Sequence, residues 1–346
     1  MKRRFTPKQS NCKIDINNYL TIEALEDELT VSLSNFDLTF KCEYCIDGND
    51  DWKILYTDSI IPTINSGHTL SFRGYLNPNY LYGKEGIGTF IVNKNFNLKG
   101  NVMSMLFGDA GKDNYSLSSK NYAFYKLFYN CTTLKSVSAN FLPATTLSNS
   151  CYTYMFYKCT SLTTAPELPA TTLTNCCYQY MFNSCTSLTT APELPATTLA
   201  TYCYAYMFNN CTSLTTAPEL PATTLADSCY SRMFGGCYSL IVAPTLPATT
   251  LASYCYYEMF YDCTSLTEAP ELPATTLVEH CYSNMFKYCT KLNYIKMLAT
   301  DISADNCLYN WVKGVASSGT FVKHPDMTSL PTGTSGIPSG WTVVDA

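Results

Sequence analysis

The sequence predicts an α/β repeat solenoid of 26-residue coils, each with a short helix and a short strand, preceded by a small β domain. One column of cysteines recurs every 26 residues, at Cys151, Cys177, Cys203, Cys229, Cys255, Cys281 and Cys307. A second column follows eight residues later in six of these units, at Cys159, Cys185, Cys211, Cys237, Cys263 and Cys289. The unit Cys-Tyr-x-x-Met-Phe-x-x-Cys-Thr-Ser-Leu-Thr-Thr-Ala-Pro-Glu-Leu-Pro-Ala-Thr-Thr-Leu is nearly verbatim at 177–202 and 203–228. A unit this short cannot bury its own apolar face, so the units must stack on one another.

Composition and charge exclude several classes of protein. The chain has 346 residues, 46% of them hydrophobic, which is enough for a sizeable core. Its net charge of −5 argues against a nucleic-acid partner. We find no run of about 18 apolar residues, so no membrane span is expected. The first residues lack the apolar segment of a secretory signal, so no signal peptide is visible.

The N-terminal part is expected to differ from the repeats. Residues 1–19 are predicted to form a basic arm, which is either a solvated tail or a segment that docks to an acidic partner. Residues 20–98 are predicted to form a small antiparallel β domain, which could attach the protein to a virion or a cell surface. Its alternating apolar runs lie at 29–33, 36–40, 69–73 and 89–92.

Residues 99–318 are assigned to about nine coils, and residues 319–346 to a C-terminal cap or tail. In 151–159 the apolar positions i, i+4, i+5 and i+8 share one helical face, which predicts a short helix. The following Thr-rich segment is predicted to be extended, and Pro166 should leave its strand short or interrupted. Strands stack at about 4.8 Å and helices at about 8–10 Å, which predicts a bent right-handed solenoid with a concave strand face.

The cysteines are expected to pack as buried thiols. Within a helix, cysteines eight residues apart lie about 12 Å from each other, too far for a disulfide. The first column is therefore predicted to be free, while the second lies nearer the strand and leaves disulfides open as an alternative. Cys42 and Cys45 form a lone CxxC, and on a strand they would point to opposite faces. No metal site and no cofactor are predicted.

The repeat resembles that of BspA-like leucine-rich-repeat surface proteins, through Met-Phe-x-x-Cys-Thr-Ser-Leu and a later Leu-Pro corner over about residues 100–315. It departs from that family in its longer coil and in having Met where the family often has Ala. The stretches 18–27 and 336–343 are similar to proteins of gut anaerobes and the phages that infect them. The resemblance implies a leucine-rich-repeat-like solenoid that acts in adhesion or recognition at a surface, and it offers no catalytic residues.

Candidate ligand-binding residues are the positions that vary while the frame repeats. They flank the Met-Phe pair and are predicted to face outward, although neutral variation of a surface is an equal alternative. One position holds Tyr154, Tyr180, Tyr206, Arg232, Glu258 and Asn284. Another holds Tyr157, Asn183, Asn209, Gly235, Tyr261 and Lys287. Exposed tyrosines suit recognition and can stack on sugar rings.

A column of glutamates is a weaker candidate for a cation site. It holds Glu167, Glu193, Glu219 and Glu271, with Thr245 in the remaining coil. These carboxylates could share a calcium or another cation. The favoured alternative is solvated side chains on an otherwise neutral face.

The sequence therefore predicts a non-enzymatic recognition or adhesion protein that binds a host or cell-surface ligand, protein or glycan, through a curved solenoid. A phage or prophage tail component is the first hypothesis, which places the protein in the virion. The second is a bacterial BspA-like adhesin at the cell surface. The third is a carbohydrate-active enzyme with an acidic groove, although no catalytic triad, dyad or phosphate-binding loop stands out.

Overall fold

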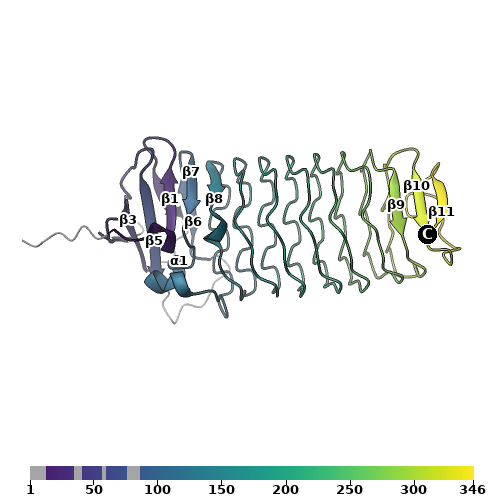
Figure 1. Cartoon of the computed structure of the whole chain (residues 1–346), viewed down its shortest axis with the longest axis horizontal. Helices are drawn as coiled ribbons and strands as arrows, with labels where there is room; N and C mark the ends of the chain where they lie inside the picture. Colours follow the sequence, from purple (N-terminus) through teal and green to yellow (C-terminus); the bar gives the residue numbers. More distant parts are fainter. Residues whose placement is uncertain (1–12, 35–40, 57–59, 76–85) are drawn as a thin grey trace, which may run out of the picture.

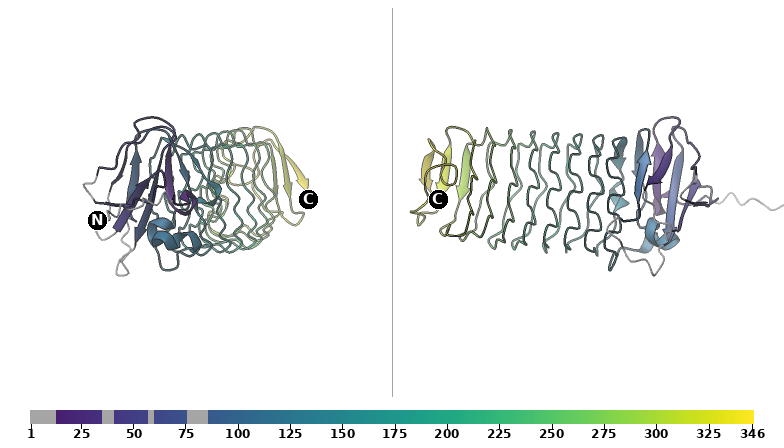
Figure 2. Two further views of the ribbon diagram at one scale, coloured as in Figure 1. Left: turned by 60° about the vertical axis from the view of Figure 1, so that its left-hand side comes forward. Right: turned by 180° about the vertical axis from the view of Figure 1, so that it is seen from behind.

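The computed structural model describes residues 13–34, 41–56, 60–75 and 86–346. Most of the predicted basic arm and the predicted strand at 36–40 lie outside these residues. The molecule is elongated: a sheet-rich body at the N-terminal end is followed by coils stacked along the long axis (Figure 1). The chain ends in a group of strands at the opposite tip (Figures 1 and 2).

The N-terminal body is built on a six-stranded sheet in the order β4-β3-β5-β1-β7-β8. Its strands are β1 (Leu20–Ala24), β3 (Lys41–Ile46), β4 (Lys53–Leu55), β5 (Thr69–Tyr75), β7 (Phe96–Lys99) and β8 (Leu134–Val137). A separate antiparallel pair holds β2 (Val31–Ser34) and β6 (Thr89–Val92). The strands predicted at 69–73 and 89–92 are thus observed, and the run at 29–33 is observed as a bridge at Leu29 followed by β2.

The sheet passes directly into the coils. Its first five strands pair antiparallel, whereas β7 and β8 pair parallel, as consecutive coils do. The sheet therefore continues across the predicted boundary between residues 98 and 99, and that boundary stays a prediction. Four short helical segments adjoin this junction: η1 (Ile16–Asn18), α1 (Ser104–Phe107), η2 (Gly108–Asp113) and η3 (Ala139–Phe141).

The helix predicted in each coil is wrong for the coils from residue 120 onward, and α1 is the one α-helix in the described residues assigned to the coils. Ser150, Tyr154 and Lys158 adopt φ values of 57°, 59° and 57°, and a right-handed helix needs negative φ at every residue. The same three positions are left-handed in the next coils, at Cys176, Tyr180, Ser184, Tyr202, Tyr206, Asn210, Ser228, Arg232 and Gly236. From 150 to 159 the chain therefore forms consecutive turns, in which apolar side chains point inward with a period of four residues.

Hydrogen bonding explains why turns replace the helix. Alternate amides donate within their own coil, as Met155 N does to Tyr152 O at 3.1 Å. The amides between them donate to the next coil, as Tyr154 N does to Gln179 O at 3.0 Å. A nine-residue helix would leave its first four amides and its last four carbonyls without partners in the helix. In the turn ladder each amide from 150 to 159 has a carbonyl partner.

The Thr-rich side of the coils carries only isolated parallel bridges between β8 and β9 (Tyr294–Met297), for example Thr190↔Thr216 and Thr216↔Val242. Short or interrupted strands are thus confirmed. On the turn side, the buried tyrosine and phenylalanine rings that stack between neighbouring coils lie 5.6 to 5.9 Å apart rather than at helix spacing. This is close to the spacing of about 4.8 Å expected for bridged parallel strands. The predicted bend is therefore wrong, and the stack runs without a pronounced bend (Figures 1 and 2).

Cysteine and aromatic columns fill the core of the coils. All cysteines among the described residues are free thiols, and all but Cys176 are buried. Each thiol of the second column donates to a backbone carbonyl in the preceding coil, as Cys185 Sγ does to Phe156 O at 3.1 Å. The predicted free thiols of the first column are confirmed, and the disulfide alternative for the second is not observed. Phenylalanine rings stack beside them, with Phe156 and Phe182 5.6 Å apart.

The C-terminal segment 319–346 packs against the last coil. It adds β10 (Thr320–Lys323) and β11 (Thr342–Asp345), which pair parallel with each other, and β10 pairs with β9. Trp311 is fully buried there and donates its indole N–H to Gly336 O at 2.8 Å. None of the helices in the described part of the chain has the length and apolar character needed to cross a bilayer.

Candidate ligand-binding surface

Three predicted tyrosines form a stacked column on the turn side of the coils. Tyr154 and Tyr180 stack with ring centroids 4.5 Å apart, and so do Tyr180 and Tyr206. Each occupies the same left-handed backbone position in its coil, so the side chains project in the same direction at every step. All three are half-buried.

A cation lies at each end of this column. The ammonium of Lys126 is 5.7 Å from the ring centroid of Tyr154, and the guanidinium of Arg232 is 5.8 Å from that of Tyr206. We call the run Lys126, Tyr154, Tyr180, Tyr206 and Arg232 the tyrosine stripe. The inner ring faces are covered by neighbouring rings and the outer two face cations, which leaves little ring face for the predicted stacking on sugar rings. Burial and the adjacent Tyr206 and Tyr154 raise the pKa of the Tyr180 hydroxyl, which keeps it uncharged at neutral pH.

The far end of the stripe is held by Glu258 and by a glycine. Arg232 Nε lies 3.1 Å from Glu258 Oε2, and its guanidinium is 5.2 Å from the Tyr261 ring. A Cβ on Gly235 would come within 2.8 Å of Asn209 Nδ2 and 2.9 Å of Arg232 Cγ. Gly235 therefore gives Arg232 the space to lie across its own coil.

A second aromatic group flanks the near end of the stripe. Tyr157 stacks on Tyr129 at 4.9 Å and meets Tyr154 edge-on at 5.4 Å. Tyr125 also meets Tyr154 edge-on, at 5.9 Å. The sequence prediction missed Tyr125, Lys126 and Tyr129, because they lie in a degraded copy of the unit. Alignment of this copy with the repeated unit could have identified them, because Lys126 occupies the repeat position of Tyr154 in a unit that is two residues longer.

The predicted asparagines do not belong to the surface. Asn183, Asn209 and Asn284 are only 4%, 8% and 6% exposed, so the prediction that they face outward is wrong. Asn183 Nδ2 donates to Asn209 Oδ1 at 3.1 Å, and Asn209 Nδ2 donates to Gly235 O at 2.7 Å. A polar side chain repeated at one position bonds to its copy in the next coil, which makes the amides part of the interior ladder. Lys287 remains partly exposed, 5.6 Å from the Tyr261 ring.

The glutamate column lies on the opposite, Thr-rich side. Glu167 and Glu193 line a shallow hollow of about 360 Å³ with proline rings, and Glu193 and Glu219 line another of the same size. Glu219 accepts a hydrogen bond from Thr245, and Glu271 pairs with Lys296 at 3.1 Å. Across the described residues, no three His, Cys, Asp or Glu side chains converge as metal ligands would.

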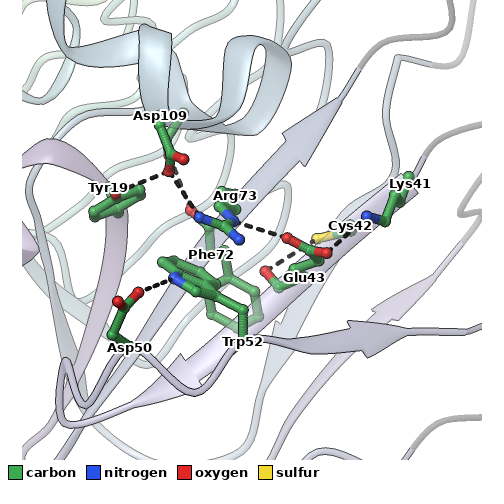
Figure 3. A network of polar contacts seen from close by, with 10 residues as sticks. Tyr19, Lys41, Cys42, Glu43, Asp50, Trp52, Phe72, Arg73 and Asp109 are labelled. Atoms are coloured by element: carbon green, nitrogen blue, oxygen red, sulfur yellow. Dashed lines mark hydrogen bonds and ion pairs between the residues drawn. The ribbon is translucent and has the colours of Figure 1, made fainter. Parts of the chain in front are cut away.

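A polar network in the N-terminal body has a structural role (Figure 3). Arg73 of β5 donates to Glu43 of β3 and to Asp109 of η2, both at 2.8 Å. Its guanidinium also lies 4.1 Å from the centroid of Trp52, whose indole donates to Asp50 at 3.0 Å. The network ties the sheet to the helical turn at residues 108–113.

Stacked coils of one repeated unit define the class of repeat proteins. The chain belongs to the BspA-type leucine-rich-repeat family, because the family model described as "BspA type Leucine rich repeat region" matches it in six copies over residues 120–240 and 196–313. These stretches cover more than half of the chain. No curated protein and no solved structure matches it.

Proposed function

We propose that this protein is a non-enzymatic recognition protein whose coils form a leucine-rich-repeat solenoid that presents the tyrosine stripe to a surface ligand, protein or glycan. The observation that carries the proposal is the stacking of Tyr154, Tyr180 and Tyr206 at 4.5 Å on a half-exposed face. Tyrosines suit recognition because they offer a large amphipathic contact area with few rotatable bonds. Prior stacking lowers the entropy that they lose on binding.

Membership of the BspA-type family supports a role in surface adhesion. We propose the finer assignment that the protein is a tail-associated component of a phage or prophage, with a bacterial cell-surface adhesin as the alternative. Proteomics of purified virions separates the two. Presence in particles supports the phage assignment, and presence on intact cells with absence from particles contradicts it.

The experiment that tests recognition measures retention of the full chain on immobilised host-cell surface extracts. We expect Tyr180→Asn to weaken retention by at least about 1 kcal/mol, because Tyr180 is the centre of the stripe. Asn suits the left-handed backbone at this position, so the variant should fold. Tyr238→Asn is the matched control, since Tyr238 is exposed and lies outside the stripe. Equal retention of both variants and the unaltered protein would contradict the proposal, as would release of reducing sugar from the extracts.

A further inference from the structure

A hollow of about 490 Å³ opens where β6 adjoins the coil at 123–131, at the near end of the tyrosine stripe. Its polar lining consists of Ser34, Thr89, Lys126, Tyr129, Asn130 and Thr132. Its wall is held by one backbone and one side-chain hydrogen bond: Phe90 N donates to Leu127 O at 2.8 Å, and Thr89 Oγ1 donates to Lys126 O at 2.9 Å. The hollow is therefore a built feature of the junction between the sheet and the coils.

The ammonium of Lys126 is held at this hollow by aromatic rings instead of a carboxylate. It lies 5.0, 5.2 and 5.7 Å from the ring centroids of Tyr125, Tyr129 and Tyr154. Cation–π contacts orient an ammonium and leave its charge uncancelled. The positive charge therefore remains for a ligand.

A second ammonium adjoins the first through stacked rings. Tyr129, which contacts Lys126, stacks on Tyr157 at 4.9 Å, and Lys158 Nζ lies 5.4 Å from the Tyr157 ring. The ion pairs formed by the described residues include neither Lys126 nor Lys158. The surrounding sequence, 114–166, has four lysines and no Asp or Glu, although the whole chain carries −5. The coils that carry these two lysines are thus locally basic in an acidic protein.

We propose that the hollow and the adjoining Tyr125, Lys126, Tyr129, Tyr154, Tyr157 and Lys158 bind an anionic saccharide. Its carboxylate or sulfate pairs with the two ammonium groups, and its hydroxyls bond to the tyrosine hydroxyls and to Asn130. This inference rests on the proposed recognition function and names the class of ligand. Charge complementarity selects the anion, because a charged acceptor bonds to an ammonium more strongly than a neutral one does.

The lining favours a saccharide over an acidic protein. The core of a protein–protein interface is apolar and depleted in lysine. Here Lys126 lines the hollow beside half-buried rings, and hydroxyl and amide side chains make up half of the lining, next to the apolar Phe90, Ile91 and Val92. Such a surface matches the polar groups of a sugar chain.

The test measures binding of the full chain to dextran sulfate, polygalacturonate, neutral dextran and poly-glutamate, by biolayer interferometry at low and at physiological salt. We expect one or both anionic polysaccharides to bind in a salt-sensitive way and neutral dextran not to bind. The comparison of sulfate with carboxylate identifies the anionic group. Lys126→Gln combined with Lys158→Gln should weaken binding roughly tenfold or more. Lys135→Gln is the control, since Lys135 lies in β8 and does not line the hollow.

Unfolding curves of the three proteins separate loss of binding from loss of fold. Equal losses for Lys135→Gln and for the double variant would overturn the proposal, since charge alone would then drive binding. Tighter binding of poly-glutamate would overturn it in favour of an acidic protein. Retention on host-cell extracts without binding of either anionic polysaccharide would overturn the ligand class alone. If the protein neither is retained on host-cell extracts nor binds either anionic polysaccharide, the recognition function is overturned as well.

Discussion

The amide of Tyr154 donates to the carbonyl of Gln179 in the next coil, at 3.0 Å. A helix would send that bond four residues back within the same coil. The difference shapes the surface, because these bonds start alternately from left-handed residues such as Tyr154, whose side chain is half-exposed, and from residues such as Phe156, whose side chain is buried. Stacked tyrosines are therefore a consequence of how the coils are joined.

The left-handed backbone makes a prediction about substitutions at Tyr180, whose φ is 57°. Val is β-branched and strained in this conformation, whereas Asn tolerates it. Both lose the ring contacts, so we expect Tyr180→Val to lower the free energy of unfolding by about 1–2 kcal/mol more than Tyr180→Asn. Urea unfolding of the two variants measures the difference. Equal stabilities would show that φ is negative at this position.

Gly235 should be sensitive to the addition of a single methyl group. Its Cβ would lie 2.8 Å from Asn209 Nδ2 and 2.9 Å from Arg232 Cγ, so we expect Gly235→Ala to cost about 1–3 kcal/mol of unfolding free energy. Chemical denaturation provides the measurement. Ser213→Ala in the preceding coil, at a partly exposed position, is the control and should change stability by less than about 0.5 kcal/mol. A Gly235→Ala protein as stable as the control would mean that Arg232 does not lie across the glycine.

The thiols should differ sharply in reactivity. Burial raises the pKa of Cys151 and Cys211 to about 12, so they hold almost no thiolate at neutral pH. Cys176 is the half-exposed exception. In a Cys12→Ala background, we expect a thiol reagent to modify Cys176 first and the remaining cysteines only after denaturation. Mass spectrometry locates the labels, and Cys176→Ala should abolish the rapid phase. A denatured protein with few free thiols would contradict the buried-thiol core.

The Arg73 network predicts a loss of stability in acid. Burial acts to raise the pKa of Glu43, but hydrogen bonds from Lys41 and Arg73 outweigh it and hold that pKa below its usual value. A carboxyl with a lower pKa in the folded state stabilises above its unfolded pKa of about 4.3. That contribution disappears as pH falls through the folded pKa. We expect the melting temperature to fall with acid more steeply in the unaltered protein than in Glu43→Gln. Parallel pH profiles of the two proteins would show that Glu43 contributes nothing.

Much of the architecture could be predicted from the sequence because the 26-residue period fixes which residues are neighbours in space. The cysteine columns, the Met-Phe core and the interrupted strands follow from that period and from Pro166. The prediction of a helix was wrong because apolar residues at every fourth position fit a run of turns as well as one face of a helix. The prediction of curvature was wrong for the same reason, since it assumed that helices pack side by side in neighbouring coils.

The candidate site was predicted in part. Placing Tyr154, Tyr180 and Tyr206 together required only the period. The burial of Asn183 and Asn209 could not be read from the sequence, because it depends on an amide bonding to its own copy in the next coil. Lys126 and Tyr129 were missed because their coil departs from the repeated unit, and that departure is where the coil meets the sheet.

Solution NMR on protein labelled selectively at tyrosine amides and alanine and cysteine carbonyls tests the central claim most directly. The account predicts a positive φ at Tyr180 and a scalar coupling across a hydrogen bond from its amide to Ala205 O in the next coil, where the two atoms lie 3.0 Å apart. A negative φ together with a coupling to Cys176 O, four residues back, would contradict it and restore a helix to each coil.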